Sequence, residues 1–245
     1  LTEALGRVLA HDAIAAEELP PFANSAMDGY ALRAADTLTA AATHPVRLRL
    51  VGEVPAGRVY AGIVGVGEAV RILTGAPLPA GADAVLEQEV VSVAGDAVMV
   101  AHPVGSGNNI RPAGDDVRLG MLLARAGTEI SPARVALLAA LGFATVNVTR
   151  RPRVAILSTG DELAPLGQTP QPGQIRESNS PYLAAAVARA GGVPLLLGVA
   201  PDRADDLRAR LLAAREADVI LTSGGVSVGD YDLVKQILAE QGTVD

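Results

Sequence analysis

Hydrophobic and polar positions alternate with two different periods in the last third of the chain. Apolar runs typical of strands occur at 154–158, 193–200 and 217–223, and the unbroken run at 193–200 predicts a buried strand. Segments with helical spacing follow these runs, at 179–190, 204–217 and 231–240. Because strand–helix–strand crossovers are right-handed, this order predicts a doubly wound, mostly parallel α/β sheet.

The predicted helices carry end signals and an apolar face. Asn179 or Ser180 is expected to cap the first helix, Pro181 suits its first turn, and Gly191–Gly192 should stop it. The next helix is amphipathic, and the leucines predicted on its apolar face are Leu207, Leu211 and Leu212.

The region before this sheet has a different pattern. Between 21 and 115, short strand-like runs are separated by Gly- and Pro-rich segments, which predicts a compact β-rich domain. The strand-like runs are 46–54, 69–76, 83–91 and 97–104.

Two segments flank the β-rich region and are predicted to be helical. The first is 2–15, and the second is 131–142, where Ser131 is a suitable cap, Pro132 a first residue and Gly142 a stop. We expect the two to pair in a connecting domain. The predicted domains are 1–20 with 116–150 for connection and dimerisation, 21–115 for the β-rich insertion, and 151–245 for an incomplete α/β domain.

Composition narrows the classes of function. A hydrophobic fraction of 49 % with 19 % charged residues is ample for a core. No apolar run approaches the roughly 18 residues of a membrane span, and LTEALGRVLA has no leader pattern, so a cytoplasmic protein is expected. The net charge of −7 disfavours nucleic acid or anionic lipid as a partner. The chain has no cysteine, and its histidines are scattered, which disfavours thiolate, zinc and Ser-His chemistry.

Polar loops follow the three predicted strands. In an open parallel sheet, ligands bind outside the carboxyl ends of the strands. Those ends are followed here by STGDEL at 158–163, by Pro201–Asp202, and by TSGGVSVGD at 222–230. The convergence of three such loops predicts a binding site at one edge of the sheet.

The glycine-rich loop at 222–230 is suited to a phosphate or another anion. Its glycines permit close approach, its N–H groups can form an anion nest, and a helix N-terminus follows. It matches neither a P-loop nor a dinucleotide fingerprint. The alternative is a tight strand-to-helix turn. The candidate anion-binding residues are Thr222, Ser223, Gly224, Gly225, Ser227 and Lys235, with Ser158, Thr159 and Gly160 from the STGDEL loop.

Carboxylates occur in the same loops. Beside a phosphate they would suit Mg²⁺, which takes a few carboxylates together with phosphate oxygens. Asp202 and Asp230 could instead cap helices, and Lys235 could be a solvated side chain. Glu162 is a stronger candidate because it follows a glycine turn at a strand end. The acidic residues of this edge are Asp161, Glu162, Asp202, Asp230 and Asp232.

A second cluster of polar residues lies in the β-rich region. Asp28-Gly29 within PPFANSAMDGYAL is by itself a hairpin-turn signal, although the polar residues around it exceed what a turn needs. Thr74 ends a predicted strand in RILTGA. In NNIRPAGDD, Arg111 beside Asp115 and Asp116 is most simply a salt-bridged surface turn.

These stretches, in this order, resemble the MoeA family of molybdopterin molybdenumtransferases, which includes the C-terminal domain of gephyrin. The resemblance rests on PPFANSAMDGYAL, GEVPAG, RILTGAPLPAGADAV, GNNIRPAGDD, SPARVALLAALG, RPRVAILSTGDEL, GQIRESNSPYL and TSGGVSVGDYD. It implies insertion of molybdate into adenylylated molybdopterin with release of AMP, dependent on Mg²⁺.

The resemblance also implies roles for individual residues. The positions tied to activity are Asp28, Thr74, Glu162 and Asp232, and the metal positions are Asp202, Asp116 and Asp232. Ala23 departs from the family pattern, which has an acid there. Family members are dimers whose site combines the α/β domain of one subunit with the β domain of the other. They also continue beyond QGTVD with basic residues for molybdate, so the resemblance implies a C-terminally truncated chain that is expected to be inactive without the rest of the family's α/β domain.

Two other functions share parts of this pattern. MogA-type molybdopterin adenylyltransferases resemble the α/β region and could act as partners, but they lack the MDGYA-bearing region. A non-catalytic scaffold of the gephyrin type is the other alternative, and the acidic positions present in the chain favour catalysis over it.

Overall fold

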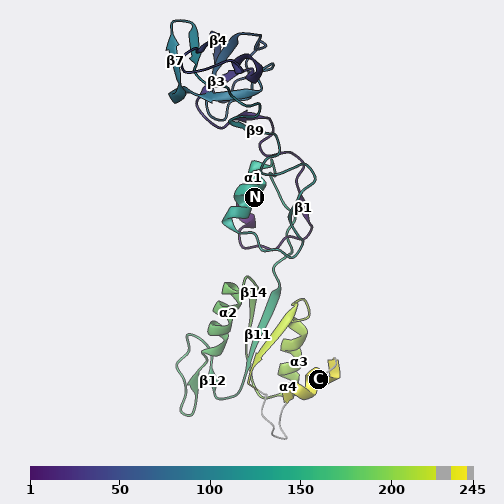
Figure 1. Ribbon diagram of the computed structural model, residues 1–245. Helices are drawn as coiled ribbons and strands as arrows, with labels where there is room; N and C mark the ends of the chain where they lie inside the picture. Colours follow the sequence, from purple (N-terminus) through teal and green to yellow (C-terminus); the bar gives the residue numbers. More distant parts are fainter. Residues whose placement is uncertain (225–232, 242–245) are drawn as a thin grey trace. The chain divides into compact units, whose positions relative to one another are not determined.

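The computed structural model describes residues 1–224 and 233–241 and divides into two compact units, Leu1–Asn147 and Val148–Asp245 (Figure 1). The predicted division of the first unit into a connecting and a β-rich domain stays a prediction. Among the described helices, none has the length and apolar character needed to cross a membrane.

The first unit is built around a six-stranded mixed sheet. The strand order is β6-β3-β5-β4-β8-β7, and all neighbours are antiparallel except β4 and β5. Alternate residues pack on its two faces, with Leu32 and Leu86 in one core cluster and Ala31 and Val85 in the other. The strands are β3 (Gly29–Leu32), β4 (Val46–Val54), β5 (Glu68–Ile72), β6 (Ala84–Glu87), β7 (Val91–Ala94) and β8 (Ala97–Val100).

Each of the four strand-like runs therefore contains a strand, although the runs 83–91 and 97–104 leave the strand conformation after Glu87 and Val100. The pattern did not predict β3 or β7. A hairpin turn at Asp28-Gly29 is wrong, because Gly29 pairs with both Ile72 and Glu87 inside the sheet. Glycine is required there by close approach of the chains. A Cβ atom on Gly29 would lie 2.1 Å from the carbonyl oxygen of Leu86.

Shorter elements complete the first unit. Helix α1 (Pro132–Ala140) is confirmed, with the Ser131 side chain accepting a hydrogen bond from the Arg134 amide. The predicted helix at 2–15 is wrong beyond a 3₁₀ turn at Thr2–Ala4. The remaining elements are β1 (Ala13–Ile14) paired with β10 (Leu122–Ala124), β2 (Asn24–Ser25) paired with β9 (Ile110–Arg111), and 3₁₀ turns at Ala34–Thr37 and Gln88–Val90.

The reason for the missing helix is pairing with a distant segment. The amide of Leu9 donates to the carbonyl of Thr128, and the amide of Gly6 donates to that of Ile130. These bonds hold the opening segment against 121–130 and replace the local bonds of a helix. Tertiary pairing of this kind overrides helical spacing.

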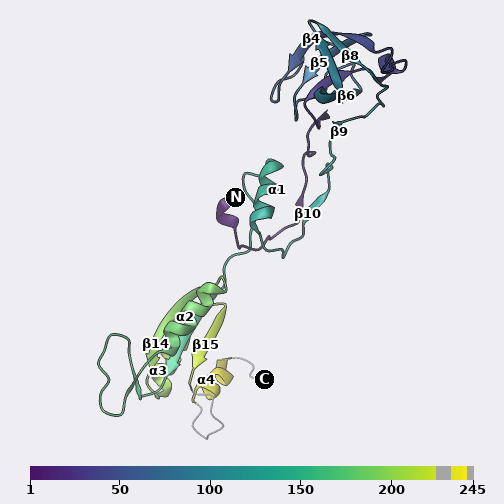
Figure 2. The ribbon, with the colours of Figure 1, turned by 60° about the vertical axis from the view of Figure 1, so that its left-hand side comes forward.

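The second unit contains a parallel sheet in the order β14-β11-β15. Leu157 packs with α3 and α4, whereas the next residue, Ser158, bonds to Ser180 of α2, so helices cover both faces (Figures 1 and 2). The elements are β11 (Arg153–Thr159), β12 (Leu163–Ala164), β13 (Ile175–Arg176), α2 (Asn179–Arg189), β14 (Val193–Ala200), α3 (Ala204–Ala213), β15 (Val219–Ser223) and α4 (Leu233–Gln241).

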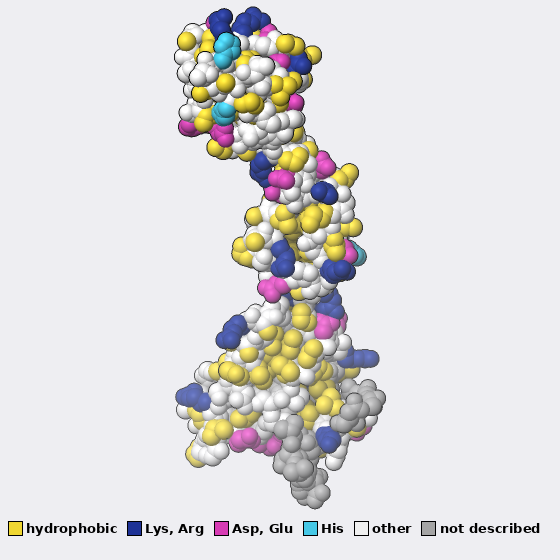
Figure 3. Space-filling view, in the orientation of Figure 1, with side chains coloured by type: hydrophobic (Ala, Val, Ile, Leu, Met, Phe, Trp, Pro, Cys, Tyr) yellow, Lys and Arg dark blue, Asp and Glu magenta, His cyan; other side chains and the backbone are white. Residues whose placement is uncertain are grey.

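Three predictions for this unit are wrong in detail. Strand β14 is an edge of the described sheet rather than a buried strand, and its Leu196 is 54 % exposed. Leu212 is also exposed, while Leu207 and Leu211 are buried as predicted. Helix α2 begins at Asn179, so its N-cap is Ser178 and not Asn179 or Ser180 as predicted. The Ser178 side chain makes no capping hydrogen bond. Figure 3 shows hydrophobic side chains gathered on the visible face of this unit.

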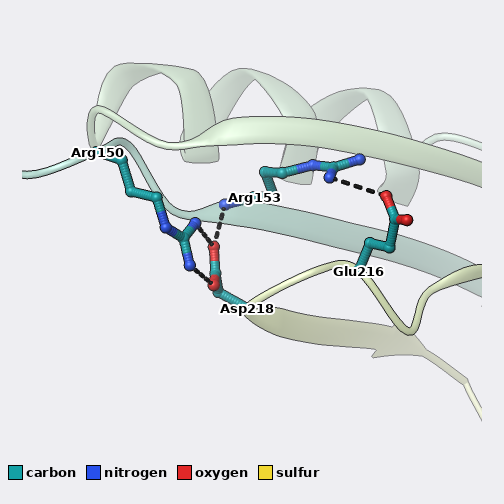
Figure 4. Close-up of polar contacts among 4 residues, drawn as sticks. All are labelled: Arg150, Arg153, Glu216 and Asp218. Carbon is teal, nitrogen blue, oxygen red and sulfur yellow. Dashed lines mark hydrogen bonds and ion pairs between the residues drawn. The ribbon is translucent and has the colours of Figure 1, made fainter.

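An ion-pair network joins the amino ends of β11 and β15 (Figure 4). Both terminal nitrogens of the Arg150 guanidinium donate to the Asp218 carboxylate, and the Arg153 amide donates to it at 2.8 Å. Arg153 also pairs with Glu216 at 3.2 Å. The bonds from Arg150 and then Arg153 hold the pKa of Asp218 at about 2, below its ordinary 3.8.

Replacing Gly29 by Ala should destabilise the first unit by about 1–3 kcal/mol, the usual cost of overpacking a filled site. The cause is the contact with the Leu86 backbone, which cannot move without shifting β6. Urea unfolding measures the change. Gly105→Ala is the matched control, since a Cβ atom there meets nothing within 4 Å. Equal stabilities for the two variants would contradict the packing argument.

Asp218→Asn should lower the melting temperature of the second unit at pH 7. The depressed pKa means that the ionised carboxylate stabilises the fold above pH 3.8 and that this contribution is lost as pH falls toward about 2. The difference between variant and wild type should therefore shrink over that interval in circular dichroism melts. Glu216→Gln, at a side chain 83 % exposed, should change little. A difference that is the same at pH 7 and pH 2 would refute the assignment.

Candidate functional site

A pocket of about 420 Å³ opens at the carboxyl ends of β11 and β14 in the second unit. This is the edge at which the sequence predicts a ligand site. It brings together five predicted residues, Thr159, Gly160, Glu162, Asp202 and Gly224, the last of which directly follows β15. The pocket thus combines two glycines, whose backbone a ligand can approach closely, with the carboxylates of Glu162 and Asp202.

The loop after β11 is held in place by backbone bonds. The Gly160 amide donates to the carbonyl of Ala200 at 3.2 Å, and the Ile175 amide donates to that of Glu162 at 2.8 Å. Gly160 has φ of +139°, a conformation that disfavours any residue with a Cβ atom. Glu162 is therefore fixed between the sheet and the short β12–β13 pair.

Asp202 comes from the second strand end. Its amide lies 3.4 Å from the Asp161 carboxylate, so the loops after β11 and β14 are in contact. Apolar side chains form the rest of the pocket, and sequence reasoning did not name them as site residues. They come from the residue after β14 and from the buried faces of α3 and α4, namely Pro201, Leu207, Leu233 and Val234.

Gly224 forms a wall of the pocket because of its contact with Thr159. With φ of +100°, a Cβ atom at this position would lie 2.8 Å from the Thr159 carbonyl oxygen and 2.9 Å from its hydroxyl oxygen. The ends of β11 and β15 therefore approach each other as closely as glycine allows.

Within the part of the chain that the structure describes, the other predicted binding residues do not line this pocket. Ser158 is fully buried and bonds to Glu177, while the Ser223 hydroxyl accepts a bond from Asn179. Thr222 is partly buried within β15. Lys235 is exposed on α4 and is not among the lining residues. Gly225, Ser227, Asp230 and Asp232 lie outside the described residues.

In the first unit, the structure brings Asp28 and Thr74 together. The amide and the hydroxyl of Thr74 both donate to Oδ1 of Asp28, each at 2.7 Å. The backbone bond first, then the hydroxyl bond and the charge of Arg71, lower the pKa of Asp28. Asp28 is thus an ionised acceptor at neutral pH and is suited to holding a cation or a donor rather than to supplying a proton.

The remaining acidic candidate, Asp116, is engaged in an ion pair. Arg111 lies 2.7 Å from Asp116 and 3.5 Å from Asp115, which confirms the salt-bridged turn expected from NNIRPAGDD. Within residues 1–224 and 233–241, no three acidic, histidine or cysteine side chains gather closely enough to hold a metal ion. Glu162 and Asp202 are the predicted carboxylates that share a pocket.

Comparison with known proteins gives matches to two family models. Residues 1–142 match the MoeA N-terminal region (domain I and II), and residues 155–245 match the probable molybdopterin binding domain. The second match contains the pocket, and the first contains Asp28 and Thr74.

Individual relatives agree with these matches. "Molybdopterin molybdenumtransferase 2" of Mycobacterium tuberculosis is 45 % identical over 96 % of this chain and 58 % of its own length. "Molybdopterin molybdenumtransferase" of Nostoc sp. is 43 % identical over 99 % of this chain and 56 % of its own length. The chain thus spans little more than half the length of these relatives.

A solved structure also matches in fold. The molybdopterin biosynthesis MoeA protein from Pyrococcus horikosii has a TM-score of 0.90 and 38 % identity, covering 98 % of this chain and 61 % of that structure's chain. The family match extends over more than half of the chain, and both sequence relatives and fold agree with it. The chain belongs to the MoeA family.

Proposed function

We propose that this chain supplies the ligand pocket of a molybdopterin molybdenumtransferase, which inserts molybdate into adenylylated molybdopterin and releases AMP. The observation that carries the proposal is the meeting of Thr159, Gly160, Glu162 and Asp202 in one pocket of the unit matched to molybdopterin binding. The curated relatives that bear this activity in their names support it.

The pocket suits the phosphate end of such a substrate. Gly160 and Gly224 present backbone without Cβ atoms, so a phosphate can approach closely. Leu233 and Val234 line the pocket from the first described turn of α4. The N-terminal end of a helix carries a partial positive charge, which favours binding of an anion. The apolar side chains of α3 and α4 would exclude water from the less polar part of the ligand.

The carboxylates fit a divalent cation. Mg²⁺ is bound in proteins through one or two carboxylates together with phosphate oxygens and water, which is the donor set that Glu162 and Asp202 provide beside a phosphate site. Bound Mg²⁺ would neutralise phosphate charge. The proposal keeps Asp232 and Asp116 as further ligands predicted from the family resemblance.

Asp28 and Thr74 are proposed to act on the reacting end of the substrate. Thr74 keeps Asp28 ionised and fixed through two bonds to one oxygen, which leaves the other carboxylate oxygen for a ligand. The family resemblance supports a homodimer in which the β region of one subunit serves the α/β region of the other. It also supports a MogA-type adenylyltransferase as supplier of the substrate, and a cytoplasmic location.

The alternatives have less support. A molybdopterin adenylyltransferase would consist of the α/β unit alone, whereas residues 1–142 match the MoeA N-terminal region. A scaffold would not need the carboxylates of the pocket. The three functions differ in what they do with adenylylated molybdopterin, so one assay separates them.

The purified full-length protein, given adenylylated molybdopterin, molybdate and Mg²⁺, should release AMP. Asp202→Asn should raise the Mg²⁺ concentration for half-maximal release by about tenfold or more, because a ligand carboxylate becomes neutral. AMP is quantified by chromatography over a Mg²⁺ titration.

The matched control is Asp205→Asn, on the same segment with a side chain 99 % exposed, which should leave the Mg²⁺ dependence unchanged. Binding of adenylylated molybdopterin without AMP release would favour the scaffold. Adenylylation of molybdopterin by ATP would favour the adenylyltransferase.

Thr74→Val should raise the pKa of Asp28 toward its ordinary value while leaving it somewhat lowered. The variant loses the hydroxyl bond but keeps the backbone bond, which is the larger cause of the shift. A carboxyl-detected NMR titration of Asp28 follows the change, and AMP release should slow in parallel. Thr39→Val, at an exposed position, is the control. An unaltered Asp28 titration in Thr74→Val would exclude the proposed pairing.

A further inference from the structure

The first turn of α2 is bonded to the ends of two neighbouring strands. Nδ2 of Asn179 donates to the Ser223 hydroxyl of β15 at 2.7 Å. Two residues earlier, Glu177 accepts a bond from the Ser158 hydroxyl of β11 at 3.0 Å. The helix therefore bonds to β11 and β15 at the edge where the pocket opens.

The contact with β11 is buried and fully formed. Glu177 and Ser180 are each 4 % exposed, and Ser158 is 0 % exposed. Oε1 of Glu177 also accepts from the Ser180 amide at 2.7 Å, and the hydroxyl oxygens of Ser158 and Ser180 lie 2.9 Å apart. Breaking such a network would leave polar groups without partners, so α2 is fixed firmly to β11.

Both bonded strand residues directly precede residues of the pocket. Thr159 follows Ser158, and Gly224 follows Ser223. Gly224 forms a wall of the pocket and lies against the Thr159 backbone. The position of this wall therefore depends on the distance between the ends of β11 and β15. Sheet pairing of Ser158 with Ser223 already holds β15 beside β11. The bond from Asn179 adds a side-chain link from the end of β15 to the helix that is fixed to β11.

We propose that Asn179 is a positioning residue for the pocket, acting through Ser223 to hold Gly224 against Thr159. Asn179 is not among the residues that line the pocket, so it acts through the wall and not on the ligand. The inference deepens the proposed function and rests on it for the identity of the ligand. It also reassigns Ser223 from a ligand donor to the acceptor of this structural bond.

The test is a double-mutant cycle of Asn179→Ala and Ser223→Ala, with calorimetric titration of adenylylated molybdopterin. Each single variant should bind about fivefold more weakly than wild type, as expected for loss of one hydrogen bond. The double variant should be no weaker than either single variant, because both remove the same bond. Ser178→Ala is the matched control, since this neighbouring serine makes no side-chain cap bond.

Amide hydrogen exchange gives a readout that needs no ligand. Exchange in the segment 219–224 should be faster in Asn179→Ala than in wild type or Ser178→Ala, with the same melting temperature for all three. Wild-type affinity in Asn179→Ala, additive losses in the double variant, or unchanged exchange would each overturn the inference. Failure of the wild type to bind the ligand would instead refute the proposed function, and exchange alone would then decide the role of Asn179.

Discussion

Parallel pairing of β11 with β14 and β15 is the constraint from which the pocket follows. Antiparallel neighbours would send successive strand ends to opposite edges, whereas these three strands deliver their carboxyl ends to one edge. Glycine follows β11 and β15, and Pro201 with Asp202 follows β14. Helices α3 and α4, which follow β14 and β15 in the chain, add apolar side chains to the pocket. Polar and glycine residues that are up to about 65 positions apart in the sequence, from Thr159 to Gly224, therefore line one pocket.

Aspartate side chains have contrasting roles in this protein. Asp218 is held by two arginines at the amino ends of the strands and serves the fold. Asp202 lies at the opposite ends of the strands, lines the pocket and is proposed to serve the ligand. Asp28 lies between these cases, since its bonds from Thr74 both order a loop and keep the carboxylate ionised. Within the second unit, position relative to the strand ends separates the structural acid Asp218 from the candidate functional acid Asp202.

Much of the α/β unit could be predicted from the sequence because its periodicity and its end signals agree. The strands and helices fall where apolar runs and Gly or Pro residues place them, and Glu162 and Asp202 meet as their positions after strands require. What failed depended on distant partners. The opening segment pairs with 121–130, and neither the exposed side of β14 nor the bond from Asn179 to Ser223 leaves a local signal.

Gly29 bears on how the MDGY stretch is understood. The residue sits between β5 and β6, where the Leu86 carbonyl occupies the space a side chain would need. Any relative that keeps this strand pairing must therefore keep glycine at the position, whether or not it retains activity. Invariance of the stretch across the family would therefore have two separate causes, which are strand packing at Gly29 and the chemistry proposed for Asp28. A member that had lost catalysis would be expected to lose the acid and still keep the glycine.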